Sequence, residues 1–264
     1  MLAEITPLIL SYNEAPNIAR VLQGLIWARE VVVLDSFSDD ETVEIATSFR
    51  NVRVIQRAFD SHRNQWEFGL KETAISTPWV LALDADYVVT EELISEIKTL
   101  QAASSTAGYR AKFIYCINGK KLRSGIYPPV TVLYRRDTAS YIQDGHTQRI
   151  SVRGGIEELK SPLLHDDRKP LKRWFNSQVH YTRLEAQKLL ATDPAELEWA
   201  DRLRRWRVVV PTAMPAYCLF VRGGVFDGWR GFYYAFQRAT AELMLSVNLG
   251  HGLTRMKTDE YPGD

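Results

Sequence analysis

The sequence predicts an α/β protein with a mostly parallel sheet flanked by helices, followed by a helical, aromatic-rich C-terminal extension. Two observations support this prediction. Over the first hundred residues, short apolar runs alternate with segments whose apolar residues recur every three or four positions, which is the pattern of alternating strands and helices. From residue 171 onward, long segments of helical periodicity contain many tryptophan, tyrosine and phenylalanine residues.

Each element of the N-terminal part follows from a local pattern. Short apolar runs predict buried strands at residues 5–11, 30–35, 52–56 and 79–84. Apolar periodicity predicts helices at residues 18–26, 43–49, 64–72 and after residue 90. Asn17 precedes the first of these helices, and Asn13 could simply cap a helix, a role compatible with binding. We expect Thr90 to cap the last helix, while Ser38 and Glu41 form a capping-box pattern before the second.

The rhythm changes after residue 108. Residues 109–117 alternate, Asn118-Gly119 is a hairpin signal, and residues 131–136 read as a further strand. These segments are expected to add antiparallel strands to the sheet. Helical patterns then begin at residue 171, so we place a domain boundary between residues 170 and 171.

Composition excludes several classes of protein. The chain of 264 residues has a net charge of +1, which argues against nucleic-acid binding. Cys116 and Cys218 are far apart, and this predicts a reducing compartment rather than a disulfide scaffold. The N-terminus lacks the basic region of a signal peptide. No run is long enough to span a membrane; the longest candidate, residues 208–221, contains two prolines and is either membrane-facing or a kinked piece of core.

Polar residues follow the apolar runs at three predicted strand ends. Asp84 and Asp86 follow the fourth strand, with one residue between them. The ends of the first and second strands carry Ser11, Tyr12, Asn13, Glu14 and Asp35. Ligands of open α/β sheets bind at the carboxyl ends of the strands, and paired carboxylates can offer oxygens to Mg²⁺ or Mn²⁺. The chain has no glycine-rich phosphate loop, which disfavours Rossmann-type dinucleotide binding and P-loop chemistry.

The sequence resembles glycosyltransferase family 2, which has the GT-A fold, in three ordered segments: ITPLILSYNEAPNIARVL, VVVLDSFSDDETVEIA and WVLALDADYVV. A looser similarity through GKKLRSGIYPPVTVLYRR, DGHTQR and LLHDDRK points to the bacterial branch that includes lipopolysaccharide-core β-glucosyltransferases. The resemblance implies that residues 1–170 form a GT-A catalytic domain. It also implies inverting transfer of a sugar from a nucleotide-diphosphate sugar, with UDP favoured, to a glycan or lipid-linked glycan.

The resemblance assigns roles to particular residues. Asp35 matches the position that hydrogen-bonds the nucleotide base. Asp86 matches the metal-coordinating aspartate, Asp84 lies near the ribose and the metal, and His165 matches a late histidine of the metal shell; a structural role for His165 stays open. Arg168 and Lys169 are expected at the diphosphate or in a solvated loop. The complete donor-binding set by this interpretation is Ser11, Tyr12, Asn13, Glu14, Asp35, Gln65, Asp84, Ala85, Arg168 and Lys169.

The catalytic base is where this chain departs from the family pattern. Relatives carry Glu-Asp, or His-Glu in the lipopolysaccharide branch, whereas this chain has Gln143-Asp-Gly-His-Thr147. We expect Asp144 to be the base and keep His146 as the alternative. A simple Asp-Gly turn would explain the same residues without catalysis.

Aromatic and arginine residues are interleaved in the C-terminal third, as at Trp206, Phe220, Arg222, Trp229 and Arg230. Such a mixture fits a membrane interface, an oligomer interface or an ordinary core with a solvated rim. We expect a cytoplasmic enzyme with peripheral contact to the inner membrane; self-association stays open. Two rival classes are a non-catalytic nucleotide-binding module, which would not need Asp144, and a nucleotidyltransferase, which would start with a Gly- and Arg/Lys-rich loop.

Overall fold

The computed structural model describes residues 1–103, 105–144 and 147–259, without the side chains of residues 143, 144, 147 and 253–259. The chain divides into two compact units. The first consists of Met1–Lys121, Tyr127–Gln143 and Thr147–Lys169, and the second mainly of Leu122–Ile126 and the chain from Pro170 onward. Each unit has its own hydrophobic core, so each is described by itself.

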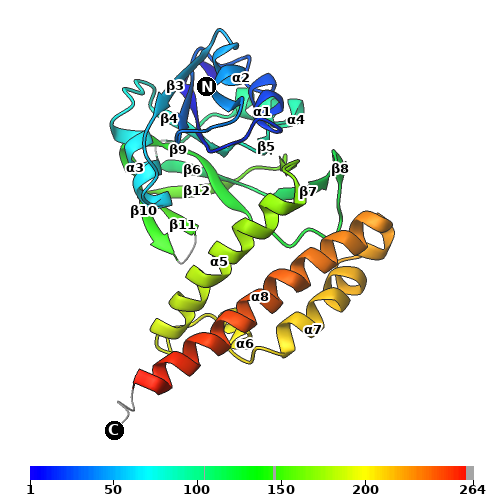
Figure 1. Ribbon diagram of the computed structural model, residues 1–264. Helices are drawn as coiled ribbons and strands as arrows, with labels where there is room; N and C mark the ends of the chain where they lie inside the picture. Colours follow the sequence, from blue (N-terminus) through cyan, green and yellow to red (C-terminus); the bar gives the residue numbers. More distant parts are fainter. Residues whose placement is uncertain (104, 145–146, 260–264) are drawn as a thin grey trace. The chain divides into compact units, whose positions relative to one another are not determined.

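The first unit is built on a seven-stranded sheet of order β12-β6-β9-β4-β1-β2-β3 (Figure 1). Its strands are β1 (Ile5–Ser11), β2 (Val31–Asp35), β3 (Val52–Gln56), β4 (Trp79–Asp84), β6 (Thr106–Ala111), β9 (Val130–Arg135) and β12 (Gly155–Glu158). β1 runs parallel to β2 and β4, and β2 to β3, whereas β9 is antiparallel to β4 and β6. The predicted α/β class with a mostly parallel sheet is confirmed.

Helices cover both faces of this sheet, because alternate strand residues point to opposite sides. The helices are α1 (Ile18–Gln23), α2 (Thr42–Thr47), α3 (His62–Lys71) and α4 (Glu91–Thr99). On one face Ile9, Val33 and Leu83 belong to a core shared with α1, α2 and α4. On the other face Leu8 and Val32 join a core that includes α3.

Of the predicted helix starts, the cap at Thr90 is confirmed and the capping box at Ser38 is wrong. The Thr90 hydroxyl does accept a hydrogen bond from Leu93 N–H at 3.2 Å, so α4 begins as predicted. Asn17 precedes α1 but makes no side-chain cap bond. The helix after β2 has Glu41 at its N-cap, again without a side-chain bond, because Ser38 donates its hydroxyl to Asp35 instead. Both polar residues are used in contacts with other segments.

Smaller sheets complete the first unit. One has the order β5-β13-β7-β8, formed by β5 (Tyr87–Val88), β7 (Phe113–Ile117), β8 (Lys120–Lys121) and β13 (Leu163–His165). Asn118 and Gly119 both have positive φ, 49° and 72°, and they join β7 to β8 in the predicted hairpin. The other pairs β10 (Ala139–Asp144) with β11 (Thr147–Val152).

The second unit is helical. It contains α5 (Leu171–Ala191), α6 (Trp199–Arg204), α7 (Val209–Ala216), a π turn η3 (Tyr217–Val221), a 3₁₀ turn η4 (Gly224–Asp227) and α8 (Trp229–Asp259). The long α8 packs against both α5 and α7 (Figure 1). Residues 208–221 form a helix with Pro215 inside it that widens into the π turn, as expected where proline removes a backbone donor. None of the described helices combines the length and apolar character of a membrane-spanning segment.

Candidate active site

The carboxyl ends of β1, β2 and β4 lie side by side, because β1 pairs in parallel with both of the other strands. Ser11 at the end of β1 is opposite Asp35 at the end of β2. Leu10, one residue earlier, is opposite Asp84 at the end of β4. The sheet therefore gathers these polar strand ends at the edge where ligands of such folds bind.

Asp35 is fully buried and surrounded by hydrogen-bond donors of the protein itself. The Ser11 hydroxyl donates to it at 2.9 Å. Ser38 donates twice, from its hydroxyl at 2.5 Å and from its backbone N–H at 2.8 Å. Gln56 Nε2 adds a longer bond at 3.3 Å. Asp35 thus ties together the loops that follow β1 and β2, and its contact with a nucleotide base stays a prediction.

Asn13 links the same two loops from the other side. Its backbone N–H donates to Ser38 Oγ at 2.7 Å, and its Oδ1 accepts from the backbone N–H of Asp39 at 2.8 Å. Its φ is 55°, a left-handed conformation that asparagine tolerates better than most residues. Tyr12, just before it, is 52% exposed and lies at the surface of this edge.

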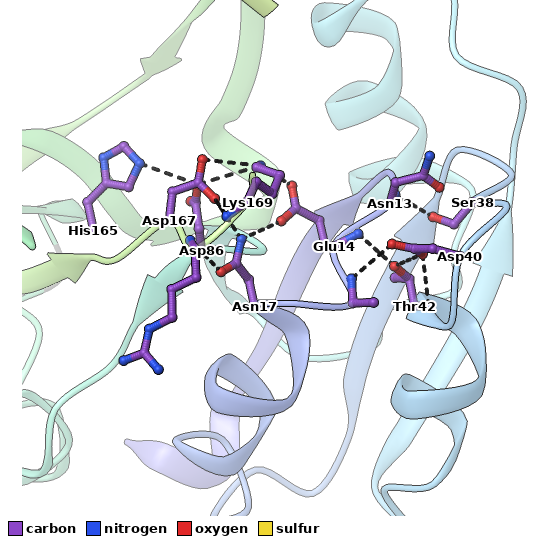
Figure 2. A network of polar contacts seen from close by, with 12 residues as sticks. Asn13, Glu14, Asn17, Ser38, Asp40, Thr42, Asp86, His165, Asp167 and Lys169 are labelled. Atoms are coloured by element: carbon purple, nitrogen blue, oxygen red, sulfur yellow. Dashed lines mark hydrogen bonds and ion pairs between the residues drawn. The ribbon is translucent and has the colours of Figure 1, made fainter. Parts of the chain in front are cut away.

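Lys169 lies among three carboxylates, which with it form what we call the acidic cluster (Figure 2). Its ammonium is 2.6 Å from Glu14 Oε1, 3.7 Å from Asp167 Oδ2 and 4.0 Å from Asp86 Oδ2. All four side chains are largely buried, with exposed fractions of 17% for Lys169 and 11%, 22% and 12% for the carboxylates. One ammonium does not balance three carboxylates, so the cluster favours additional positive charge.

His165 supplies a second group of positive character beside the acidic cluster. Pairing of β13 with β5 places His165 opposite Tyr87, and its Nε2 is 3.3 Å from Asp86 Oδ2. The rings of Tyr87, Tyr115 and Tyr127 have their centroids 5.3, 5.0 and 5.1 Å from the imidazole. These edge-to-face contacts fix the orientation of the ring toward the carboxylate.

Burial and mutual charge shift the pKa values in the site. Burial raises the pKa of Glu14 to about 7, against the opposing charge of Lys169. Burial and the neighbouring Asp86 raise the pKa of Asp84 to about 6. Burial also acts to raise the pKa of Asp86, but His165 and Lys169 outweigh it and lower the value to about 2. Burial opposes charge on His165 and Lys169, yet their carboxylate neighbours, Asp86 first, raise the pKa of both.

The three residues of the Asp84-Ala85-Asp86 sequence have different neighbours. Asp84 hydrogen-bonds with the Tyr87 side chain. Ala85 is 1% exposed and belongs to the hydrophobic core. Asp86 is 8% exposed and faces His165. Of the two aspartates, Asp86 is therefore the one within ion-pair distance of His165 and Lys169.

The donor atoms fit a divalent cation. Asp86 Oδ1 and His165 Nδ1 are buried and find no hydrogen-bond partner among the described residues. An orphaned carboxylate oxygen beside other carboxylates suits a cation ligand. Carboxylate oxygens from Asp84 and Asp86 with an imidazole are donors that Mg²⁺ or Mn²⁺ accepts. Within residues 1–103, 105–144 and 147–259, no group of three His, Cys, Asp or Glu side chains is already spaced as a metal site.

Asn17 is a residue of this site that the sequence analysis did not assign to it. It is fully buried, and its Nδ2 donates to Glu14 Oε2 at 2.8 Å and to Asp167 Oδ1 at 2.9 Å. Its Oδ1 accepts from the backbone N–H of Arg168 at 2.9 Å. Asn17 thus joins the loop after β1 to the HDDRK segment. The carboxylates of the HDDRK segment were the available sequence signal for this contact. However, Asp167, which accepts the hydrogen bond from Asn17, lies 150 positions away in sequence.

Two predicted donor-binding residues make contacts within the protein. Gln65 is 1% exposed, and its Nε2 donates to Ser36 Oγ at 2.9 Å and to the Arg57 carbonyl at 3.2 Å. The guanidinium of Arg168 donates to Asp166 Oδ2 at 2.8 and 3.0 Å. The structure places both residues in unit 1, Arg168 directly beside Lys169, and their contact with a donor stays a prediction.

The two predicted bases, Asp144 and His146, fall wholly or partly outside the described residues. Asp144 is the last residue of β10, but its side chain lies outside the described residues. His146 lies outside them entirely. Their assignment as catalytic groups is therefore carried forward only as a proposal.

Comparison with known proteins gives a family match. The family model described as Glycosyl transferase family 2 matches residues 8–146, just over half of the chain. A Rickettsia bellii protein named as an uncharacterised glycosyltransferase is 32% identical over 144 residues, covering 52% of this chain and 48% of that protein. A Rickettsia felis protein of the same name is 31% identical over 144 residues, covering 52% and 50%. The chain therefore spans about half the length of the curated relatives it matches.

One solved structure extends the likeness across both units. The crystal structure of residues 1–349 of Staphylococcus aureus TarS, in complex with UDP-GlcNAc, aligns with a TM-score of 0.50 at 15% identity. The alignment covers 94% of this chain and 92% of that chain. At this identity the likeness concerns the fold alone, which is the GT-A architecture expected from the sequence.

Proposed function

Because the chain belongs to glycosyl transferase family 2, we propose that it transfers a sugar, with inversion, from a nucleotide-diphosphate sugar to a hydroxyl of a glycan or lipid-linked glycan. The single observation that carries the proposal is Asp86. It is a buried carboxylate beside the carboxyl ends of β1, β2 and β4. Among the described residues one of its oxygens has no hydrogen-bond partner, and the other faces His165. A group arranged in this way costs folding energy and indicates a ligand.

The acidic cluster and the residues around it would have different roles in this reaction. Lys169 is a positive point charge that can turn from Glu14 toward the diphosphate of the donor, where it would stabilise the leaving group. Asp84, Asp86 and His165 would hold Mg²⁺ or Mn²⁺, which supplies charge neutralisation at a diphosphate. Arg168, anchored on Asp166, offers a second cation in the same segment. Ser11, Asn13 and Asp35 shape the adjacent loops that would receive the nucleotide.

Asp144 is our proposed general base, which takes the proton of the acceptor hydroxyl while that oxygen attacks the anomeric carbon. Asp144→Asn removes the basic oxygen and keeps the size, so turnover should fall on the order of 10²-fold or more, with donor binding unchanged. Donor-sugar transfer under single-turnover conditions measures this. Near-normal turnover, together with a His146→Ala protein that binds donor but is inactive, would move the base to His146.

The cellular setting belongs to the same proposal. We propose a cytoplasmic enzyme that works at the inner membrane on a lipopolysaccharide or other lipid-linked glycan, in line with the resemblance of its later segments to that branch. Nucleotide sugars serve as donors there, and UDP is the first nucleotide to test, because TarS, which shares the fold, was crystallised with UDP-GlcNAc.

A thermal-shift titration with UDP, in Mn²⁺ and in EDTA, tests the donor site. We expect UDP to raise the melting temperature more in Mn²⁺, since a ligand that binds only the folded state stabilises it. Asp86→Ala should abolish the Mn²⁺-dependent increment. The matched control is Asp137→Ala, an aspartate that is 66% exposed and follows β9, at the opposite end of the sheet from the acidic cluster. Equal UDP shifts in Mn²⁺ and EDTA would remove the metal from the proposal.

A further inference from the structure

The second unit carries large apolar side chains on its outside, at the turn that joins α7 to α8. Phe220, Val221, Phe226 and Trp229 are 73%, 71%, 76% and 57% exposed. We call these four side chains the apical cluster. Single exposed apolar residues are normal on soluble proteins, but several large ones within one short turn mark an interaction surface.

The turn that displays the apical cluster is held rigidly by its backbone. A Cβ on Gly231 would lie only 1.9 Å from the Gly224 carbonyl oxygen, and one on Gly224 would lie 2.7 Å from the Cys218 carbonyl oxygen. Only glycine allows these close approaches. Gly223 and Gly228 add positive φ angles of 75° and 59°. These glycines therefore fix the backbone of the turn in a conformation that leaves the side chains of the apical cluster exposed.

Asp227 is the one acidic residue between Arg205 and Gln237, and it is withdrawn from the surface by hydrogen bonds. Its Oδ2 accepts from the backbone N–H groups of Arg123 and Ser124 at 3.0 and 3.1 Å and from the Ser124 hydroxyl at 2.9 Å. The same bonds anchor the Leu122–Ile126 segment to the turn. The carboxylate of Asp227 is therefore engaged in hydrogen bonds within the second unit.

Arginines surround the apical cluster. The guanidinium of Arg230 lies over the Trp229 ring at 4.7 Å, and that of Arg123 over the Phe226 ring at 5.9 Å. Arg222 is exposed and follows Val221 directly. Residues 208–221, which lead into the turn, contain no charged side chain. Apolar side chains rimmed by arginines match a bilayer with anionic headgroups, because the apolar groups enter the acyl boundary while the arginines meet lipid phosphates.

We propose that the apical cluster docks the protein onto an anionic lipid bilayer. The proposal locates the membrane contact that the proposed function assumes, but it does not depend on sugar transfer. A second copy of the chain fits this surface poorly, since a twofold contact through it would bring Arg123, Arg222 and Arg230 of both copies together. Anionic lipid instead supplies the opposite charge.

Vesicle flotation at low salt tests the proposal, with phosphatidylcholine vesicles compared with vesicles that also contain phosphatidylglycerol. We expect the full chain to float with the anionic vesicles and to be released at high salt. The double substitution Phe226→Ala and Trp229→Ala should weaken binding by roughly tenfold or more, because both side chains lose apolar burial. Arg230→Gln should weaken binding to anionic vesicles roughly fivefold. All three residues lie at the surface turn, and circular dichroism verifies folding.

The matched control is Trp199→Ala, which removes a tryptophan of α6 that is 76% exposed and lies outside the apical cluster; it should bind like the wild type. Asp86→Ala should also float normally, so a failed donor site and a failed membrane site give different results. Wild type that stays at the bottom of the gradient, or an equal loss in Trp199→Ala, would overturn the proposal. So would a wild-type dimer in light scattering that the Phe226→Ala and Trp229→Ala double variant converts to monomer.

Discussion

Asp35 is the last residue of β2 and Asp86 follows β4, the strands on the two sides of β1, yet the surroundings of the two carboxylates differ completely. Asp35 is 0% exposed and accepts hydrogen bonds from Ser11, Ser38 and Gln56. Asp86 is 8% exposed, and its Oδ1 has no hydrogen-bond partner in the part of the chain that the structure describes. The two side chains are therefore almost equally buried, but they differ in how far hydrogen bonds from the protein satisfy their carboxylate oxygens. The difference teaches that one aspartate at this edge stabilises the fold, and the other is kept ready for a ligand.

The charges around the two residues support this distinction. Asp35 receives neutral hydroxyl and amide donors from neighbouring loops, and this is the usual way to stabilise a buried carboxylate. Asp86 instead has charged neighbours of both signs, including Lys169 and Glu14. Such mixed clusters add little net stability, because desolvation offsets attraction. Stability measurements on single variants can break or sharpen the comparison.

Asp35→Ala should have the largest effect on the free energy of unfolding. The substitution leaves the buried Ser11 and Ser38 donors without their acceptor, and each such loss costs about 1–3 kcal/mol. We expect a total decrease of about 3 kcal/mol by urea denaturation. Asp35→Asn, which keeps one acceptor oxygen, should lose less. A decrease below about 1 kcal/mol for Asp35→Ala would show that the loops do not depend on this carboxylate.

Lys169→Met should have the second-largest effect and lower the free energy of unfolding by about 2 kcal/mol, because a partly buried group of carboxylates loses its central cation. Lys169→Arg is the control that keeps the charge. The double variant with Glu14→Gln should lose less than the sum of the single losses, since neutral Glu14 no longer needs the ammonium. Additive losses would mean that the 2.6 Å contact between Lys169 and Glu14 contributes no coupling.

Asp86→Asn should change the free energy of unfolding by no more than about 1 kcal/mol, although the residue is nearly as buried as Asp35. The amide oxygen can still accept from His165, and the repulsion of Asp86 with Asp84 and Glu14 disappears. A stabilised variant that no longer gains from Mn²⁺ would be the clearest sign of a functional site. A loss as large as that of Asp35→Ala would contradict the proposed difference between the two aspartates.

The sequence predicts the strand ends that carry Asp35 and Asp84 better than the loop contacts around them. The strand ends, and hence the neighbourhood of Asp35 and Asp84, follow from apolar runs that the structure confirms at β1, β2 and β4. The capping box at Ser38 was wrong because a local pattern cannot show that a buried carboxylate competes for the same hydroxyl. The side chain of Asn17 was equally ambiguous, since its partner Asp167 comes from a distant segment.

The sequence could not predict which apolar side chains of the helical unit are exposed to solvent. Periodicity identifies an apolar face of a helix, but not which neighbour covers it. Residues 208–221 were consistent with a kinked core segment or with a membrane-facing one. The structure shows that Cys218 and Leu219 are buried whereas Phe220 and Val221 are exposed, all four within the π turn that follows Pro215.

The smallest effect on the free energy of unfolding is expected from Lys71→Met, which breaks an exposed ion pair and so serves as a comparison for the buried one. Lys71 pairs with Glu67 one helical turn earlier on α3, so it repeats the residue types of the Lys169–Glu14 pair. Its side chain is 63% exposed, however, against 17% for Lys169. Water screens an exposed pair and holding it costs side-chain entropy, so its loss should lower the free energy of unfolding by only about 0.3–0.5 kcal/mol.

The stability losses of the two lysine variants should also differ in how they depend on salt concentration. The loss in Lys71→Met should vanish in molar salt, where charges at the surface are screened within a few ångströms. The loss in Lys169→Met should persist, because ions do not enter the space between Lys169 and its buried carboxylates. Urea denaturation of both variants at low and high salt makes the measurement. If the two losses shrank in parallel, the acidic cluster would be open to solvent, and the charge imbalance at Asp86 would be no reason to expect a ligand there.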